Sequence, residues 1–328
     1  MYPHAQIDML VGPVSGELLE DCPYINNLIY FDTTRKHRYE NRNSKRNNFF
    51  SYVKELKKAR YDKAYVLKRS LSSAALVFLA GIPQRIGFNT EHRGFLLTKP
   101  VPYEKDRHEV ECFLDVLRAD GFIIRDKHLE SWVKPEHSAT IEEIFKEYGV
   151  GDEVKVQIHA TSGNTNKQWS PEYFAKLVEY LVNERKVRVF YAGAATDAKV
   201  YEQIHSLIHG KLEIKPVNLC GKLTLQESLA LTSKMDLLVG CDSGNLHMAA
   251  SVNVPVIGIY GPMDYKKWGA WGDIHTCIVE NLPCVPCELK RKCEFDRACL
   301  KNIKPERVIG IVDKKLNEIL LKSEKAHD

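Results

Sequence analysis

The feature that most constrains the fold of this chain is a regular alternation of short apolar strands with amphipathic helices. Its clearest unit is Asp236–Asp264, which reads DLLVGCDSGNLHMAASVNVPVIGIYGPMD. The pattern predicts a buried strand at Leu237–Gly240, a short helix from Asn245 and a second apolar strand at Val256–Tyr260. Strands that alternate with helices in this way form parallel sheets with helices on both faces.

The same alternation extends over the rest of the chain. Strands are predicted at Ile7–Val11, Asn27–Phe31, Lys63–Leu67, Val154–His159, Val187–Tyr191 and Val217–Leu219. Helices are predicted at Phe49–Ala59, Ser72–Ala80, Glu109–Asp120, Pro171–Glu184, Asp197–His209 and Leu225–Lys234, and a capping-box spacing at Thr140–Glu143 predicts the start of a further short helix. We therefore expect an α/β fold of two Rossmann-like domains, residues 1–135 and 136–328, with a ligand site at the carboxyl ends of the strands, in the cleft between the domains.

Composition narrows the classes of function. The chain has 328 residues, 44% of them hydrophobic and 27% charged, as in a soluble globular protein of two ordinary domains. The formal net charge of +4 argues against a dedicated nucleic-acid binder. No apolar run approaches the ~20 residues of a membrane helix, and the start MYPHAQID has no features of a signal peptide. Nine cysteines in such a chain suggest reduced thiols, so we expect a cytoplasmic protein.

A polar turn, Asp242-Ser243-Gly244, separates the buried strand at Leu237–Gly240 from the helix that follows it. The first backbone N–H groups of a helix lack intrahelical partners and lie at the positive end of the helix dipole. Such an end can hold a phosphate group without a metal. The turn therefore predicts a site for a phosphorylated small molecule, although Asp242 and Ser243 can equally serve as N-cap residues.

Two further loops at predicted strand ends are polar as well. The loop after Val154–His159 carries Thr161, Ser162 and Lys167, and the loop after Val187–Tyr191 ends in Asp197. Together with the first turn, these loops supply hydroxyls, an ammonium group, a carboxylate and a helix N-terminus. A nucleoside diphosphate needs donors and positive charge for its phosphates, and an acidic group suits a ribose diol.

Each of these residues also has a plain structural interpretation. Lys167 can be a solvated loop residue, His247 can be a satisfied core histidine, and Asp197 can simply complement the dipole of its helix. What favours a binding site is that the polar groups coincide on three successive strand ends.

Several of these segments resemble glycosyltransferase family 9, the bacterial heptosyltransferases that build the inner core of lipopolysaccharide. HATSGNTNKQWSPEYFAKL (His159–Leu177) is similar to the phosphate loop of that family, and CDSGNLHMAASVNVPVIGIYGPMD is similar to its D-[ST]-G-x-x-H-x-A-A block. In the first half, Leu67–Phe88 and His108–Gly121 resemble the acceptor domain of the family. The resemblance spans nearly the whole chain.

The resemblance implies a GT-B fold and an inverting transferase that uses neither a metal nor a cofactor. Its donor is a nucleotide sugar, typically ADP-heptose, and its acceptor is a lipopolysaccharide core or lipid A–Kdo. Thr161, Ser162 and Lys167 would hold the diphosphate, and Lys167 would be the catalytic residue that stabilises the leaving diphosphate. Asp197 would reach the ribose, although the family often has Glu there. In the turn, Ser243 and Gly244 would bind phosphate, and Asp242 would bind sugar hydroxyls. His247 would support the turn.

The start of the chain departs from the family pattern. Members usually begin with a strand, a loop containing Gly-Asp and a helix that ends in a phrase like YPHAQID, and this sequence starts inside that phrase. The segment carries the Asp that acts as general base in the family, and no residue here matches it. Two interpretations follow. Either the sequence has a shortened start and the protein is an ordinary transferase, or it is a catalytically inactive remnant that binds the donor.

Basic residues of the first half suit an anionic acceptor. Arg69 and Arg93, with Lys68 and Arg85, lie near predicted strand ends or loops, where they can meet phosphates and carboxylates. A dense basic run comprises Arg35, Lys36, Arg38, Arg42, Lys45 and Arg46. It is either a solvated loop or a contact with the anionic inner face of the inner membrane, worth about 1 kcal/mol per charge.

Four cysteines form a C-x2-C-x5-C-x5-C pattern at Cys284, Cys287, Cys293 and Cys299. A Cys₄ zinc site commonly uses two close pairs, and the second pair here is spaced too widely for that. Reduced thiols, an incidental disulfide and a structural metal remain open, and we expect no metal in the chemistry of the site.

Overall fold

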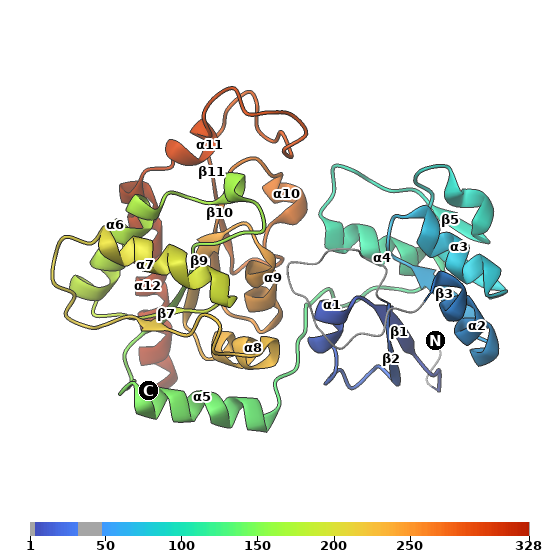
Figure 1. Ribbon diagram of the computed structural model, residues 1–328, viewed down its shortest axis with the longest axis horizontal. Helices are drawn as coiled ribbons and strands as arrows, with labels where there is room; N and C mark the ends of the chain where they lie inside the picture. The colour runs from blue at the N-terminus through green and yellow to red at the C-terminus, as the bar shows by residue number, and fades with distance from the viewer. Residues whose placement is uncertain (1–3, 32–47, 328) are drawn as a thin grey trace. The chain divides into compact units, whose positions relative to one another are not determined.

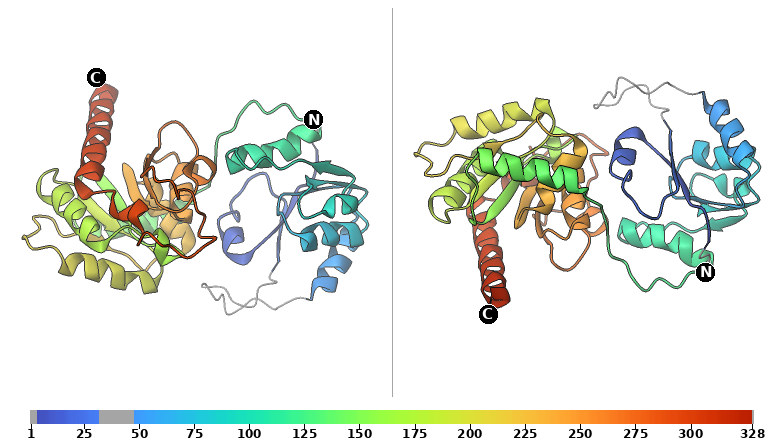
Figure 2. Two further views of the ribbon diagram at one scale, coloured as in Figure 1. Left: turned by 90° about the horizontal axis from the view of Figure 1, so that it is seen from above. Right: turned by 90° about the horizontal axis from the view of Figure 1, so that it is seen from below.

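The computed structural model describes residues 4–31 and 48–327 of the chain. The chain forms two compact units, Met1–Lys127 and His128–Asp328 (Figures 1 and 2). The boundary predicted from the sequence followed residue 135, whereas the structure divides the chain after Lys127.

The second unit is built on one parallel sheet of six strands in the order β11-β10-β9-β6-β7-β8. Its strands are β6 (Lys155–His159), β7 (Arg188–Tyr191), β8 (Val217–Asn218), β9 (Leu237–Cys241), β10 (Val256–Tyr260) and β11 (Thr276–Val279). The four longest predicted strands of this half are confirmed, each within one residue at either end. β11 was not predicted from the sequence.

Helices cover both faces of this sheet, as the alternating pattern predicts (Figure 1). One face packs against α6 (Pro171–Asn183), α7 (Ala198–Ser206) and α12 (Pro305–His327), and the other against α5 (Pro135–Glu147), α8 (Leu225–Ser233) and α9 (Gly244–Ser251). Successive residues of β9 point to opposite faces, so Leu237 and Val239 lie in the first core and Leu238 in the second. The remaining short elements of this unit are η2 (Thr165–Lys167), η3 (Ala195–Asp197), α10 (Tyr265–Trp268) and α11 (Ala298–Lys301).

The start predicted for α5 is wrong. The helix begins at Pro135, five residues before the predicted capping box at Thr140. Proline at the first helical position has a φ angle already suited to a helix. The Thr140 hydroxyl instead donates to the Glu136 carbonyl one turn earlier, at 3.1 Å, inside the helix. A capping box does exist at α8, where Thr224 and Glu227 satisfy each other's backbone N–H groups.

The first unit has two parallel sheets in its described residues. One pairs β1 (Asp8–Val11) with β2 (Asn27–Tyr30), and the other has the order β3-β4-β5, formed by Lys63–Val66, Gln84–Phe88 and Lys99–Val101. Its helical elements are α1 (Pro13–Glu17), α2 (Phe49–Ala59), α3 (Leu71–Leu79), η1 (Arg93–Leu96) and α4 (Glu109–Ala119). Tyr52 of α2 anchors a core to which both sheets contribute, and its hydroxyl donates to the Tyr30 carbonyl at 2.8 Å.

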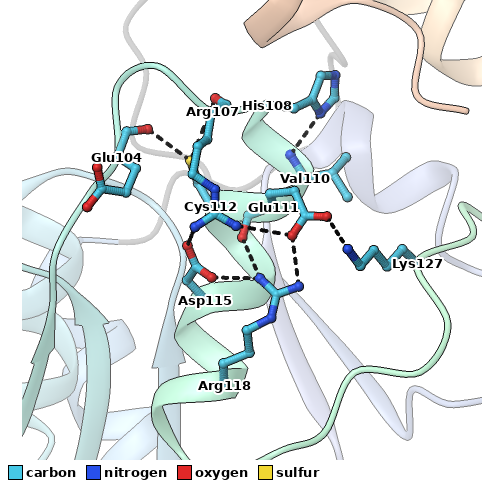
Figure 3. Close-up of polar contacts among 9 residues, drawn as sticks. All are labelled: Glu104, Arg107, His108, Val110, Glu111, Cys112, Asp115, Arg118 and Lys127. Carbon is cyan, nitrogen blue, oxygen red and sulfur yellow. Dashed lines mark hydrogen bonds and ion pairs between the residues drawn. The ribbon is translucent and has the colours of Figure 1, made fainter.

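One face of α4 carries a closed set of ion pairs (Figure 3). Glu111 lies 2.8 Å from Arg118 and 2.6 Å from Lys127, and Asp115 lies 2.7 Å from Arg107. The hydrogen bond from Lys127 lowers the pKa of Glu111 most, with Arg118 adding to the effect. The network therefore fastens the last residue of this unit to its last helix.

No helix among residues 4–31 and 48–327 is long and apolar enough to cross a membrane.

Candidate functional site

The strand order of the second unit creates a switch point between β6 and β9. The chain runs from β6 outward through β7 to β8, and then returns to the other side of β6 to form β9, β10 and β11. Loops that leave β6 and β9 at their carboxyl ends therefore diverge, and ligands of open α/β sheets bind in the crevice that this produces. Two of the three polar loops singled out in the sequence lie here, because one follows His159 and the other follows Cys241.

Side chains from these two loops contact each other directly. Lys167 Nζ lies 2.9 Å from Asp242 Oδ2, with the lysine side chain 23% exposed and the aspartate 8%. Ser162 Oγ donates to the Asp242 carbonyl at 2.7 Å. The structure thus brings Ser162, Lys167 and Asp242 together at the switch point, and Lys167 is not a solvated loop residue.

The turn before α9 does not behave as a conventional helix cap. Ser243 occupies the N-cap position without a side-chain capping bond, and the Asp242 carboxylate is turned toward Lys167. Ser243 Oγ is buried and has no hydrogen-bond partner among the described residues. Gly244 is exposed, and a Cβ at this position would meet no atom within 4 Å. The first turn of α9 is therefore open to an anion, and the hydroxyl beside it still has bonding capacity.

A buried histidine joins the same two loops. His159, the last residue of β6, places Nδ1 2.8 Å from Asn245 Nδ2 and Nε2 3.5 Å from Thr161 Oγ1. Burial lowers the pKa of His159 to about 4, although Asp197 and a hydrogen bond with the Ala192 backbone act in the opposite direction. The ring is therefore neutral at physiological pH.

His159 and Asn245 were not predicted from the sequence as candidate site residues. His159 was noted only as the first residue of a motif, and Asn245 only as the start of a helix. The available signal was a polar side chain at the end of an otherwise apolar strand, since such a residue is buried by the strand and needs partners.

Asp197 and His247 have contacts other than the Lys167–Asp242 pair. Asp197 is buried, and its Oδ2 accepts from the Ala194 N–H at 3.0 Å, which closes the turn after β7. His247 is half-buried on α9 and interacts electrostatically with His275. The roles of both residues toward a ligand stay predictions.

The two predicted arginines of the first unit differ in exposure. Arg93 is 1% exposed, and its guanidinium donates to the Phe88 carbonyl at 3.0 Å. Arg69 is 29% exposed, stacks 3.9 Å above the Tyr103 ring and lies 3.4 Å from Glu109. Arg69 is thus the more accessible of the two, and Arg93 is held by the Phe88 carbonyl and the Thr90 hydroxyl. The basic run from Arg35 to Arg46 lies outside the described residues.

The four clustered cysteines remain thiols. Burial, together with the nearness of Cys284, Cys287 and Cys293, raises the pKa of Cys299 to about 11. Among residues 4–31 and 48–327, no three His, Cys, Asp or Glu side chains form a group ready to hold a metal ion. Cys284, Cys287 and Cys293 lie in the loop that leads from β11 to α11, and Cys299 lies in α11 itself.

A comparison with known proteins identifies the family of this chain. Residues 49–298, more than half of the chain, match the model of glycosyltransferase family 9 (heptosyltransferase). The lipooligosaccharide heptosyltransferase 2 of Haemophilus influenzae is 31% identical over 278 residues, which cover 80% of this chain and 77% of that protein.

Two solved structures show the same fold. The family 9 glycosyltransferase of Veillonella parvula has a TM-score of 0.80 at 22% identity, covering 96% of this chain and 89% of that one. The Escherichia coli ADP-heptose lipopolysaccharide heptosyltransferase II has a TM-score of 0.74 at 23% identity, covering 98% and 92%. The expected α/β fold of GT-B type is confirmed. The chain is a glycosyltransferase and belongs to glycosyltransferase family 9, the heptosyltransferase family.

Proposed function

We propose that this protein transfers a heptose from ADP-heptose, or a closely similar nucleotide sugar, to a lipopolysaccharide core acceptor, with inversion at the anomeric carbon and without a metal. The observation that carries the proposal is the contact between Lys167 and Asp242 at the β6–β9 switch point, beside the open first turn of α9. The printed names of the relatives, lipooligosaccharide heptosyltransferase and ADP-heptose lipopolysaccharide heptosyltransferase, support the sugar and the acceptor.

The ion pair gives Lys167 and Asp242 complementary tasks. Before the donor binds, each neutralises the other in a partly buried position. Diphosphate oxygens then compete for the Lys167 ammonium, which frees the Asp242 carboxylate to accept hydrogen bonds from sugar hydroxyls. Lys167 next stabilises the charge that develops on the leaving diphosphate, as a fixed cation does most effectively in a site prepared in advance.

The other polar groups complete the donor site. Thr161 and Ser162 supply hydroxyls from the β6 loop, while Ser243 and the Gly244 backbone supply donors at the N-terminus of α9. Asp197, at the end of the β7 loop, is the acidic group for the ribose. One ammonium and a helix N-terminus together supply the positive charge that a metal provides in other transferases, which is why we propose a metal-independent reaction.

The acceptor would be bound by residues of the first unit. Arg69 keeps its guanidinium partly exposed, and it can form charge-assisted bonds to the phosphates or carboxylates of a lipid A–Kdo acceptor. Arg93 is almost fully buried, so it would act indirectly, through its hydrogen bond to the Phe88 carbonyl. An acceptor of this kind requires the protein to work in the cytoplasm, at the inner face of the inner membrane.

A transfer assay tests the proposal. The protein is incubated with ADP-heptose and a heptose-deficient lipopolysaccharide core, with UDP- and GDP-sugars as donor controls, and products are followed by mass spectrometry and NMR. We expect one added heptose from the ADP donor only, an inverted anomeric configuration, and the same rate in EDTA. ADP binding without transfer would instead identify a donor-binding protein, and the absence of ADP binding would refute the proposal.

A further inference from the structure

His159 is a buried titratable residue to which the proposed donor contacts give no role. It ends β6 and is 6% exposed. The glycine that faces it on β9 is part of this arrangement, because a Cβ at Gly240 would come within 2.6 Å of the His159 carbonyl oxygen and 2.8 Å of its Cβ. The strands are therefore close enough at this point to hold the imidazole between the two loops of the site.

The imidazole contacts residues from both loops, and it also hydrogen-bonds with the Ala192 backbone after β7. Asn245, the second residue of α9, lies 2.8 Å from Nδ1. Thr161, two residues along the β6 loop, lies 3.5 Å from Nε2. A single rigid ring thus connects the β6 loop to the first turn of α9, across the switch point where the diphosphate is proposed to bind.

Both nitrogens of the ring lie close to polar partners. A neutral imidazole has one donor nitrogen and one acceptor nitrogen. The Asn245 amide nitrogen, which can only donate, lies 2.8 Å from Nδ1 and 3.4 Å from Nε2, and the ring also hydrogen-bonds with the Ala192 backbone. The Thr161 hydroxyl, 3.5 Å from Nε2, can pair with the ring as a donor or as an acceptor.

We propose that His159 is a positioning residue of the donor site: its ring holds Asn245 at the N-terminus of α9 and the Thr161 hydroxyl of the β6 loop in place beside the proposed diphosphate position. The inference rests on the proposed function, since it assumes that a nucleoside diphosphate binds at the switch point. It adds a residue that touches no substrate and acts through two that line the site.

A second buried histidine provides a matched control. His275 lies just before β11, and its Nδ1 accepts from the Val256 N–H at 3.2 Å. Val256 begins β10, so this bond is at the amino end of the sheet, opposite the site. His275 therefore has the same chemistry as His159 and a comparable structural contact, but none at the carboxyl ends of β6 and β9.

The test compares ADP binding, measured by isothermal titration calorimetry, in the full chain and three variants. His159→Phe keeps the ring volume and removes the hydrogen bonds of the imidazole, and we expect it to weaken ADP binding about tenfold. His159→Gln retains a donor and an acceptor, so its affinity should lie within about threefold of the parent. His275→Phe should lower the unfolding temperature and leave the dissociation constant unchanged.

A purely structural role would have a different signature. It would lower the fraction of protein that binds, seen as reduced stoichiometry, while the remaining molecules bound ADP with the parent affinity. In the transfer assay, positioning should raise the KM for the donor and leave the KM for the acceptor unchanged. Parent-like affinity in His159→Phe, or an equal loss in His275→Phe, overturns the inference while the proposed function stands. If the parent itself does not bind ADP, both fall together.

Discussion

Gly240 sets how closely β9 can approach β6 beside the site. It is paired with His159 in the sheet register, and a Cβ would collide with the His159 backbone and Cβ. A collision with backbone atoms cannot be relieved by rotating a flexible side chain, so one of the two strands would have to move.

Replacement of this glycine should therefore be costly. We expect Gly240→Ala to lower the unfolding free energy by about 1–3 kcal/mol in urea denaturation. Gly310→Ala is the matched control, because a Cβ at Gly310 would meet nothing within 4 Å in helix α12. Alanine is favoured over glycine in a helix, so Gly310→Ala should stabilise by about 0.5–1 kcal/mol. Destabilisation of similar size in both variants would contradict this account of Gly240.

Local sequence pattern predicted most of the individual strands of the second unit, whereas the pairing of strands far apart in the sequence could not be predicted. Apolar runs predicted β9 and β10 nearly residue by residue, since both strands are buried on both faces. β4 was missed because it opens with Gln84 and Arg85, whose polarity hides the strand. That β9 lies beside β6 depends on contacts some eighty residues apart, which no local pattern encodes.

The features of the candidate site also separate into those that local sequence predicts and those that it does not. Thr161, Ser162, Lys167 and the turn at Asp242 were predicted as site residues from residue type and from their place after strands, and their roles toward a ligand stay predictions. The ion pair between Lys167 and Asp242 and the contacts of His159 could not be predicted, because both depend on the strand order.

The N-caps of α8 and α6 can be compared by substitution. The Thr224 hydroxyl accepts from the Glu227 N–H at the start of α8, whereas Ser170, at the start of α6, has no capping bond to the backbone. We expect Thr224→Ala to cost about 1 kcal/mol of unfolding free energy. Ser170→Ala should cost no more than a few tenths of that, because its hydroxyl bonds to the Glu172 side chain instead. Thermal unfolding followed by circular dichroism measures both, and equal losses would contradict the assigned caps.

At the scale of the molecule, the two units have separate cores and differ in how acid should affect them. The two histidines whose pKa values fall to about 4, His159 and His275, are both in the second unit. Both shifts arise mainly from burial. The unfolded chain therefore binds protons more readily than the folded unit between pH 6.5 and 4, so stability falls as the pH is lowered through that range.

Tryptophan fluorescence reports on this unit alone, since the chain's four tryptophans, Trp132, Trp169, Trp268 and Trp271, all lie in it. We expect the urea midpoint of the fluorescence transition to fall steadily from pH 6.5 toward pH 4. His159, with its pKa lowered from 6.5 to about 4, contributes up to about 3 kcal/mol. His159→Gln should show a shallower decline. A midpoint that stays constant over this range would show that the histidines do not titrate as described.

We propose that Lys167, paired with Asp242 at the β6–β9 switch point, binds the diphosphate of a nucleotide-sugar donor. The most direct measurement is ADP affinity, by isothermal titration calorimetry, in Lys167→Ala and in Lys176→Ala. Lys176 is an exposed lysine of α6 that lies 3.7 Å from Glu306, so it controls for the loss of one positive charge. We predict that Lys167→Ala weakens ADP binding at least tenfold, as expected for a lost charge-assisted bond, and that Lys176→Ala binds like the parent. Equal affinity in the parent and Lys167→Ala would show that Lys167 does not bind the diphosphate.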